Sequence, residues 1–333
     1  MNGRSGTLAE LGENALLALI RDRIGAAPHG ELWSGDDAAY VATGNGLLIT
    51  TDLLVEGVDL DLAYTSPADL GWKLVAVNVS DIAAMGGTPR HAVAGLVLRP
   101  DMETRFVEDL LDGMLDACRT WSVSLVGGDI SGGQEVMASL TLTGDVEGAP
   151  VTRSGARPGD GVFVTGALGG SAAGLLALRH GLGRDDAACA PAVERHLRPQ
   201  PPAAAGPALQ DVPVSAMIDV SDGLLLDLTR LLDASGVGCR ITRADVPIDP
   251  VVGPVLDRLP DPVDGSGLAL TGGEDFELLF TVPAELSAEA TAAVGVAGTG
   301  ARRIGTIVEG TRTIDGAVLD ESEGLGWDHL LNR

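Results

Sequence analysis

Lysine is almost absent from this sequence. Lys73 is the only lysine among 22 basic residues, and all the others are arginines. A Walker A loop requires a Gly-Lys-Ser/Thr sequence, and a protein kinase requires a lysine on a strand beside the nucleotide. Lys73 lies in the segment Leu70-Gly71-Trp72-Lys73-Leu74 and fits neither pattern. If the chain uses ATP, it must therefore hold the phosphate groups in another way.

Cysteines and long apolar runs are also scarce. Cys118, Cys189 and Cys239 form no Cys-x-x-Cys pair, and an odd number of cysteines suits no closed disulfide framework. No run of about 18 apolar residues is present, and the N-terminus lacks the charged and then apolar pattern of a signal peptide. We therefore expect a soluble protein of the reducing cytoplasm with no membrane partner.

Acidic residues, in contrast, are abundant. The formal net charge is −25, which argues against binding to nucleic acids or to anionic membranes. Two interpretations of this acidity stay open at this point. The carboxylates keep the surface soluble, or some of them are clustered to hold cations. Their positions, rather than the total charge, must decide.

The composition and the hydrophobic pattern predict a two-domain protein that contains both helices and strands. The length of 333 residues suggests two domains, and an aromatic content of 3% predicts a core of Ala, Val, Leu and Ile. Leucines at helical spacing predict an amphipathic helix over 8–25. A second helix should be capped by Ser66 and should run to Met85, before a Gly-Gly pair.

Strands and a third helix are expected in the rest of the first half. The alternation of apolar and polar residues over 46–62 predicts a strand, and 91–98 should form another strand. Residues 103–120 form a helix. Residues 122–146 are expected to form a pair of strands that is interrupted by the Gly-Gly-Asp sequence at 127–129.

A change in composition near Gly148 marks a domain boundary, with 1–148 as the first domain and 149–333 as the second. In the second domain, a short strand at 217–220 should turn into a helix that is capped by Ser221.

Residues 268–282 should repeat the plan of a strand, a Gly-Gly-acid turn and a strand. The same order of elements is expected at 122–142. We interpret this similarity either as a shared architecture of the two domains or as chance similarity at Gly-Gly turns.

Several acidic residues stand next to glycine or a small hydroxyl residue at the end of a strand or helix. Glycine lets a carboxylate approach a ligand without crowding, and magnesium prefers such oxygen ligands. Each acid by itself also has an ordinary explanation as a turn or capping residue. The set comprises Asp36, Asp37, Asp52, Asp81, Asp129, Asp219, Asp222, Glu274 and Asp275.

Asp81 is the hardest of these acids to explain as an ordinary residue. It lies inside an apolar helix, three residues after Asn78, so both side chains point to the same side. A buried ionised carboxylate without a partner is costly. Asp81 therefore requires a cation or a pairing arginine, and Lys73 lies two turns away on a similar face. We favour the metal interpretation.

Two glycine-containing helix starts, at 165–171 and 219–223, could bind a phosphate through free backbone N–H groups. Arg153, in a Thr-Arg-Ser-Gly turn, could clamp a phosphate or could be an ordinary surface arginine.

Seven segments together resemble the thiamine-monophosphate kinase family. This family belongs to the superfamily of aminoimidazole ribonucleotide synthetase, selenophosphate synthetase and a hydrogenase-maturation protein. The order and spacing of the segments hold from about residue 30 to Trp327. The segments are Gly35-Asp36-Asp37-Ala38-Ala39, Thr50-Thr51-Asp52-Leu53-Leu54-Val55-Glu56-Gly57, Ala76-Val77-Asn78-Val79-Ser80-Asp81-Ile82-Ala83-Ala84-Met85-Gly86, Gly127-Gly128-Asp129, Thr152-Arg153-Ser154-Gly155-Ala156, Ile218-Asp219-Val220-Ser221-Asp222-Gly223-Leu224 and Gly272-Gly273-Glu274-Asp275-Phe276-Glu277-Leu278.

The resemblance implies an α+β fold of two domains. An N-terminal α+β domain binds ATP and magnesium and forms a homodimer through its strands, and a C-terminal α/β-sandwich domain completes the cleft. It also implies the roles of individual residues. Nucleotide contacts are expected at Gly128, Asp129, Arg153 and Ser221, and catalytic roles at Asp81, Asp129 and Asp222. Several Mg²⁺ ions are expected on Asp37, Thr50, Thr51, Asp52, Asp81, Asp129, Asp219 and Asp222.

The expected substrate contacts include one departure from the family. Glu274 and Trp327 match its thiamine-phosphate contacts, but Asp59 stands where the family usually has histidine. The resemblance implies transfer of a phosphoryl group from ATP to thiamine monophosphate, which gives thiamine diphosphate. Two alternatives stay open: another ATP-using enzyme of the superfamily, similar to aminoimidazole ribonucleotide synthetase, or an inactive nucleotide- or metal-binding regulator.

Overall fold

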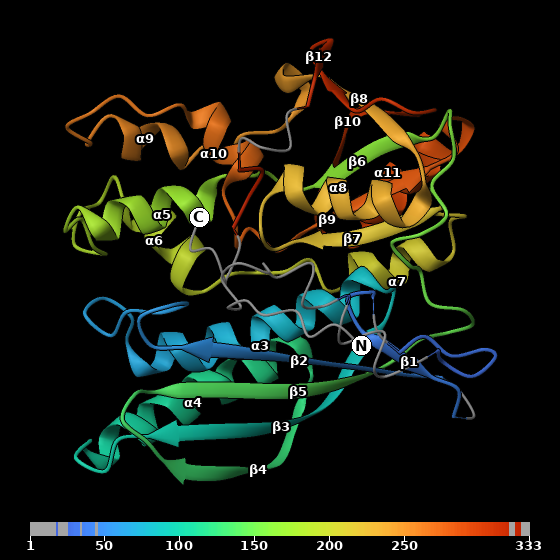
Figure 1. Ribbon diagram of the computed structural model, residues 1–333. Coiled ribbons are helices and arrows are strands. Elements are labelled where there is room, and N and C mark those ends of the chain that lie inside the picture. Colours follow the sequence, from blue (N-terminus) through green and yellow to red (C-terminus); the bar gives the residue numbers. More distant parts are fainter. Residues whose placement is uncertain (1–17, 19–25, 34, 44–45, 320–323, 328–333) are drawn as a thin grey trace, which may run out of the picture.

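The computed structural model describes residue 18 and residues 26–33, 35–43, 46–319 and 324–327, and it contains two β-sheets, one in each half of the chain (Figure 1). The helix expected over 8–25 lies outside the described residues except for Ala18. Among the described residues, no helix is both long enough and apolar enough to cross a membrane.

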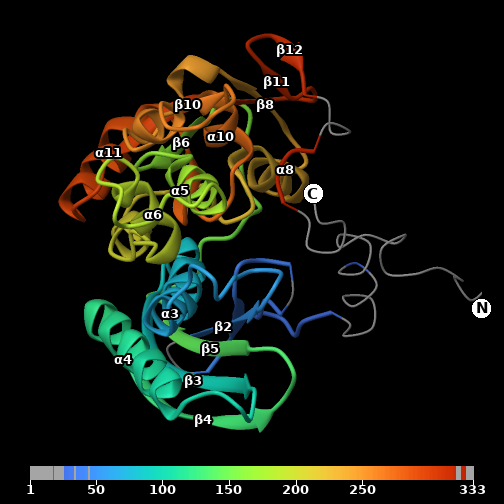
Figure 2. The ribbon, with the colours of Figure 1, turned by 90° about the vertical axis from the view of Figure 1, so that its left-hand side faces the viewer.

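The N-terminal half forms a five-stranded sheet that is covered by two helices on one face (Figure 2). The buried side chains of β2 and β5 alternate along each strand, as expected for a sheet with one face on the core. The strand order is β1 (Ala39–Val41), β2 (Leu47–Val55), β5 (Met137–Asp145), β3 (Thr88–Leu98) and β4 (Ser124–Gly132), and the helices are α3 (Pro67–Ala84) and α4 (Thr104–Trp121).

Helix α3 begins and ends where the sequence predicts. Ser66 is its N-cap and accepts a hydrogen bond from the N–H of Asp69 at 3.2 Å, with Pro67 at the first helical position. Gly86 follows the C-cap with a φ of 73°, a conformation that favours glycine. Nearly every residue of α3 is buried, because it packs on its own sheet and also on the second domain. Asp69, Lys73 and Ser80 of α3 contact side chains of the second domain.

The C-terminal half contains a seven-stranded, largely antiparallel sheet with helices packed on both faces (Figure 1). The strand order is β12 (Ala317–Val318), β11 (Thr313–Ile314), β8 (Gly238–Ile241), β10 (Ala301–Val308), β6 (Gly161–Thr165), β9 (Glu277–Val282) and β7 (Ala216–Val220). The helices are α5 (Gly170–Arg179), α6 (Ala190–Leu197), α7 (Ala205–Gln210), α8 (Leu224–Ser235), α9 (Val252–Leu256), α10 (Gly265–Thr271) and α11 (Ser287–Val296), with short 3₁₀ turns at Arg243–Asp245 and Ala284–Leu286.

Two of the expected strand patterns are wrong. Strand β4 passes through 127–129 without a break. Its backbone lies so close to β3 at Gly128 that a side chain there would collide with the carbonyl oxygen of Ala94. Here glycine permits close strand pairing instead of making a turn. The first strand expected in 268–282 is the end of helix α10, whose N-cap Asp264 accepts the N–H of Ser266 at 3.0 Å. A short apolar run such as this one does not distinguish a helix from a strand.

Candidate active site

Three of the acids proposed as metal ligands come together between the domains. Oxygen atoms of Asp37, Asp81 and Asp219 all lie within 4.8 Å of one another. Asp37 precedes β1, Asp81 is in the last turns of α3, and Asp219 is in β7, so the cluster is built from both domains. We call these three residues the acidic cluster.

The electrostatics of the acidic cluster fit a bound cation. Burial raises the pKa of Asp81 well above its ordinary value, and the negative charges of Asp52 and Asp219 raise it further. Burial and the charge of Asp37 likewise raise the pKa of Asp219. A divalent cation among these oxygens would remove the repulsion, and carboxylates are ligands that magnesium prefers.

Two hydroxyl groups orient the acidic cluster. Thr50 Oγ1 donates a hydrogen bond to Asp81 Oδ2, and Ser80 Oγ donates to Asp219 Oδ2 at 2.6 Å across the domain boundary. Asn78, one turn before Asp81, has a buried Oδ1 without a hydrogen-bond partner among the described residues. Such an orphaned acceptor one helical turn from Asp81 is also consistent with a cation site.

Strand β2 divides its three proposed metal ligands between its two faces. Thr50 and Asp52 share the face toward the acidic cluster, as the strand period of two requires. Thr51 lies on the other face, is exposed, and donates to the carbonyl oxygen of Leu140 at 3.2 Å. The structure therefore brings Thr50 and Asp52 to the acidic cluster and leaves the Thr51 hydroxyl away from it.

Arg153 is not an exposed surface arginine. Its guanidinium group lies 2.8 Å from Asp37 Oδ1, and its backbone N–H donates to Asp36 Oδ1 at 3.0 Å. Burial and the charge of Asp37 raise the pKa of Asp36 to about 7, although Arg153 opposes the shift. Arg153 is thus at the edge of the acidic cluster, where a guanidinium group could also meet a phosphate.

The turn at 221–223 differs from the expected helix start. Gly223 is the N-cap of α8, so the capping role predicted for Ser221 is wrong. The backbone N–H groups of the turn are instead bound by the buried carboxylate of Asp227. Asp222, proposed as a metal ligand, has its Oδ2 at 2.6 Å from Arg230.

Glu274 lies in an interdomain cluster of charged side chains. Its Oε1 is 2.5 Å from Lys73 Nζ, and its Oε2 is 3.1 Å from His196 Nδ1. The idea that Lys73 could be the partner of Asp81 is therefore wrong. Burial would raise the pKa of Glu274, but the charge of Lys73 and then that of His196 outweigh it and hold the pKa below its ordinary value.

The backbone at Glu274 is strained and connects the other proposed contacts. Glu274 has a φ of 66°, which is uncommon for a residue with a side chain. Its N–H donates to the carbonyl oxygen of Ser221 at 2.6 Å, and the N–H of Trp327 donates to that of Asp222 at 3.0 Å. Three segments with proposed contacts thus meet at one turn.

Three other proposed residues, which are Gly128, Asp129 and Asp59, lie outside both the acidic cluster and the turn at Glu274. Gly128 and Asp129 lie on the exposed edge strand β4, and in register Asp129 stands opposite Gly95 of β3. Three strand spacings separate β4 from β2, roughly 14 Å, so Asp129 is away from the acidic cluster of its own chain. Asp59 accepts the N–H of Val55 at 2.9 Å and closes the turn after β2.

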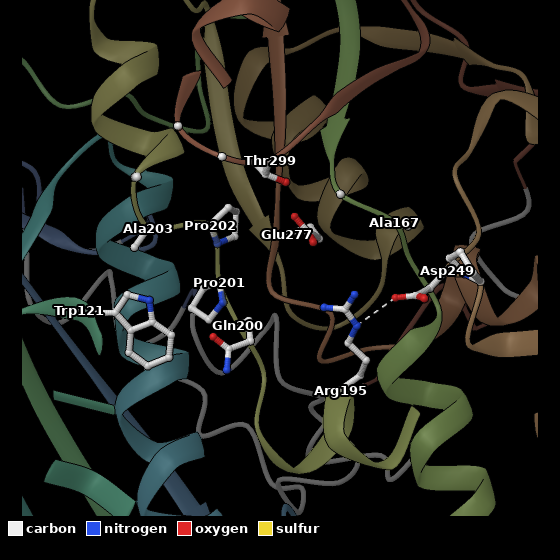
Figure 3. Close-up of a pocket in the computed structure, with 15 residues that line it drawn as sticks. Trp121, Ala167, Arg195, Gln200, Pro201, Pro202, Ala203, Asp249, Glu277 and Thr299 are labelled. Atoms are coloured by element: carbon white, nitrogen blue, oxygen red, sulfur yellow. Dashed lines mark ion pairs between the residues drawn. The ribbon is translucent and has the colours of Figure 1, made fainter. Parts of the chain in front are cut away.

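A separate cleft of about 500 Å³ lies between the linker at 200–204, Trp121 and the second sheet (Figure 3). Arg195 pairs there with Asp249 at 3.2 Å, and burial raises the pKa of Glu277 to about 7. Gly166 and Ala167, from the helix start proposed at 165–171, line this cleft, but none of the proposed metal ligands does.

Sequence reasoning missed several residues that hold the site together: Ser80, His196, Asp227 and Arg230. Ser80 directly precedes Asp81 in a segment already singled out, so that segment could have indicated it. Asp227 and Arg230 lie in the helix that the sequence predicts after the strand at 217–220. Their contacts depend on the turn, which the helical pattern does not reveal.

The chain matches two family models in succession. Residues 35–146 match the AIR synthase related protein, N-terminal domain, and residues 157–315 match the AIR synthase related protein, C-terminal domain. These matches and the two packed sheets define a protein of the AIR synthase related class.

Individual relatives show to which family within this class the chain is similar. The thiamine-monophosphate kinase of Escherichia coli (strain K12) is 42% identical over 277 residues, covering 82% of this chain and 83% of that protein. The solved structure described as "AaThiL complexed with AMPPCP and TMP" is 35% identical, covers 98% of this chain and 100% of that chain, and has a TM-score of 0.88. A crystal structure of thiamine monophosphate kinase from Aquifex aeolicus is 33% identical, covers 94% and 99%, and has a TM-score of 0.82. The chain belongs to the thiamine-monophosphate kinase family, which confirms the resemblance and the two-domain α+β fold.

Proposed function

We propose that this chain transfers the γ-phosphoryl group of ATP to the phosphate of thiamine monophosphate, which gives thiamine diphosphate and ADP. The observation that carries the proposal is the acidic cluster, in which Asp37, Asp81 and Asp219 converge from both domains. The relatives described above are thiamine-monophosphate kinases, and one related structure is described with AMPPCP and TMP.

The residues of the acidic cluster suit phosphoryl transfer with magnesium. Asp37, Asp81 and Asp219, with Asp52 beside them, would hold Mg²⁺, which when bound neutralises charge on the phosphate groups. The acceptor is a phosphate that is already ionised at neutral pH, so the chain needs no strong general base. Arg153 adds a cation at the edge of the same cluster. The chain therefore contributes alignment and charge neutralisation, which are the main requirements of this reaction.

We also propose a homodimer formed through the outer face and edge of the N-terminal sheet. Leu53, Val93, Val126 and Ile130 are all exposed there, and nearly all of β4 is exposed. An open strand edge with apolar neighbours favours pairing with another chain. Asp129 lies on this edge, so a dimer could bring it to the site of the partner subunit.

A mixed dimer tests this arrangement. We would combine a chain carrying Asp81→Asn with a chain carrying Asp129→Asn. If each site takes Asp129 from the partner, one of the two sites in the mixed dimer is intact and activity returns. If each site uses its own Asp129, both sites carry a defect and the mixed dimer stays inactive.

The direct test of the proposed function is turnover. The purified chain is incubated with thiamine monophosphate, ATP and MgCl₂, and thiamine diphosphate and ADP are measured by chromatography. Equal amounts of both products are expected. ADP formation only with another acceptor would favour a different enzyme of the class, and nucleotide binding without turnover would favour a regulatory protein.

Two further sequence-based predictions remain predictions. One is the cytoplasmic location. The other is the domain boundary between 148 and 149, which is supported by the end of the first sheet at Asp145 and the start of the second at Gly161.

A further inference from the structure

The turn between β7 and α8 is held by a carboxylate from inside the helix that follows it. Asp227 Oδ2 accepts the backbone N–H groups of Ser221, Asp222 and Gly223 at 3.0, 3.0 and 3.1 Å. The Asp227 side chain is completely buried. The N–H groups that a phosphate could have used in the turn at 221–223 are therefore already occupied by the protein.

Arg230 connects the same carboxylate to a proposed metal ligand. Its NH1 donates to Asp227 Oδ1 at 2.7 Å and to Asp222 Oδ2 at 2.6 Å. One nitrogen atom thus fixes the position of the Asp222 carboxylate relative to Asp227. Charge-assisted hydrogen bonds of this kind are among the stronger ones in proteins.

The surroundings leave the turn little freedom to move. A side chain at Gly223 would come within 2.8 Å of the carbonyl oxygen of Thr271, and one at Gly273 within 2.7 Å of that of Ser221. A side chain at Gly326 would collide with the carbonyl oxygen of Asp222. Glycines therefore let neighbouring segments pack directly on the turn.

We propose that Asp227 and Arg230 are positioning residues that set the Asp222 carboxylate for metal binding, and that the turn at 221–223 does not bind phosphate through its N–H groups. This inference rests on the proposed function and on the expectation from the family resemblance that Asp222 is a metal ligand. Residues that orient metal ligands typically contribute roughly 10- to 100-fold to metal affinity.

The test measures binding and not turnover. Asp227→Asn keeps the size of the side chain and one acceptor oxygen but removes the charge that holds Arg230. We would titrate Mg²⁺ into each variant with a saturating non-hydrolysable ATP analogue and follow the heat of binding. The half-saturating Mg²⁺ concentration should rise roughly 10-fold or more in Asp227→Asn. Asp233→Asn, on the exposed end of the same helix, is the matched control and should bind like the wild type.

A second pair of variants separates positioning from folding. Arg230→Met should weaken Mg²⁺ binding, as Asp227→Asn does. Arg230→Lys should bind Mg²⁺ more tightly than Arg230→Met, because lysine keeps a positive charge at this position. Arg230 is partly exposed, so these variants decide the matter even if Asp227→Asn does not fold. Wild-type Mg²⁺ affinity in folded Asp227→Asn or Arg230→Met would overturn the proposal. Absence of thiamine monophosphate turnover by the wild type would refute the proposed function but would leave this binding result standing.

Discussion

Lys73 Nζ lies 2.5 Å from Glu274 Oε1, so the only lysine of the chain is paired with a carboxylate of the other domain. The Lys73 side chain is 4% exposed and that of Glu274 is 29% exposed. Because Lys73 already balances the charge of Glu274, this carboxylate is better suited to accept a hydrogen bond from a substrate than to neutralise a cation. Glu274 is the position at which the family resemblance implies contact with thiamine phosphate.

Replacing Lys73 should destabilise the protein and weaken substrate binding. Lys73→Met leaves the Glu274 carboxylate without its cation, and breaking such a pair typically costs about 3 kcal/mol or more. We expect a lower midpoint in urea denaturation and a higher KM for thiamine monophosphate, with a smaller effect on the KM for ATP.

The double variant Lys73→Met/Glu274→Gln is the control for this pair. Removing both charges should recover most of the lost stability, because no uncompensated charge remains. The KM for thiamine monophosphate should stay high, since the Glu274 carboxylate is absent. Additive losses of stability would show that the two residues do not interact.

Loss of one carboxylate from the acidic cluster should separate metal binding from folding. In Asp81→Asn, the repulsion among Asp37, Asp81 and Asp219 decreases, so stability without divalent cations should be equal to or higher than that of the wild type. Phosphoryl transfer should be abolished. Mg²⁺ should stabilise the wild type, by about 2.7 kcal/mol at 100 times its Kd, and should have little effect on the variant.

Thermal unfolding with MgCl₂ or with excess chelator measures both effects. Asp145→Asn, an exposed acid of β5 paired with Arg90, is the control and should retain the response to Mg²⁺. Wild-type turnover by Asp81→Asn would exclude this residue as a metal ligand.

Asp69 should make the interdomain contact sensitive to acid. Arg184 donates to its two oxygens at 2.6 and 2.8 Å, and Arg198 donates at 2.6 Å. Burial alone would raise the pKa of Asp69, but hydrogen bonds from Arg184, Ser66 and Arg198 and the charge of Arg184 lower it from 3.8 to about 2. A lowered pKa contributes stability above the unfolded value, and this contribution is lost as the pH falls from about 4 toward 2.

Asp69→Asn should therefore lower the free energy of unfolding at pH 7 by about 2 kcal/mol. Urea denaturation between pH 7 and pH 3 should show the difference from the wild type shrinking below pH 4. Asp116→Asn removes an exposed pair with Arg119 and should show no such pH dependence. A difference that is constant with pH would mean that the charge of Asp69 is not responsible.

Asp59 is expected to be structural and not a substrate contact. Its carboxylate closes the turn after β2 by accepting the N–H of Val55. Asp59→Asn retains an acceptor oxygen and should keep the KM for thiamine monophosphate. Asp59→Ala should lose about 1 kcal/mol of stability. Asp59→His, the residue usual in the family, should be tolerated or should lower the KM. No turnover by the wild type, with activity only in Asp59→His, would indicate a pocket for another acceptor.

Local signals predicted the regular parts of the fold well. Ser66, Pro67 and Gly86 define the ends of α3 because capping and positive φ are local requirements. The same reasoning failed at 127–129 and at 268–271. At 127–129, a glycine pair can mark a turn or a close strand contact, and which of the two it makes depends on the neighbouring strand. At 268–271, a short apolar run does not distinguish a helix from a strand.

The sequence by itself determined the class of the protein, its ligand chemistry and the identity of most candidate acids, because the seven segments of glycine, hydroxyl and carboxylate residues have the order and spacing of the family. Only the tertiary structure decided which of them meet. It joined Asp37, Asp81 and Asp219 across the domains and placed Asp129 on an exposed edge. It also paired Lys73 with Glu274 and Asp227 with the turn at 221–223. These contacts depend on packing between domains or on the geometry of a single turn. Neither interdomain packing nor turn geometry leaves a periodic signal in the sequence.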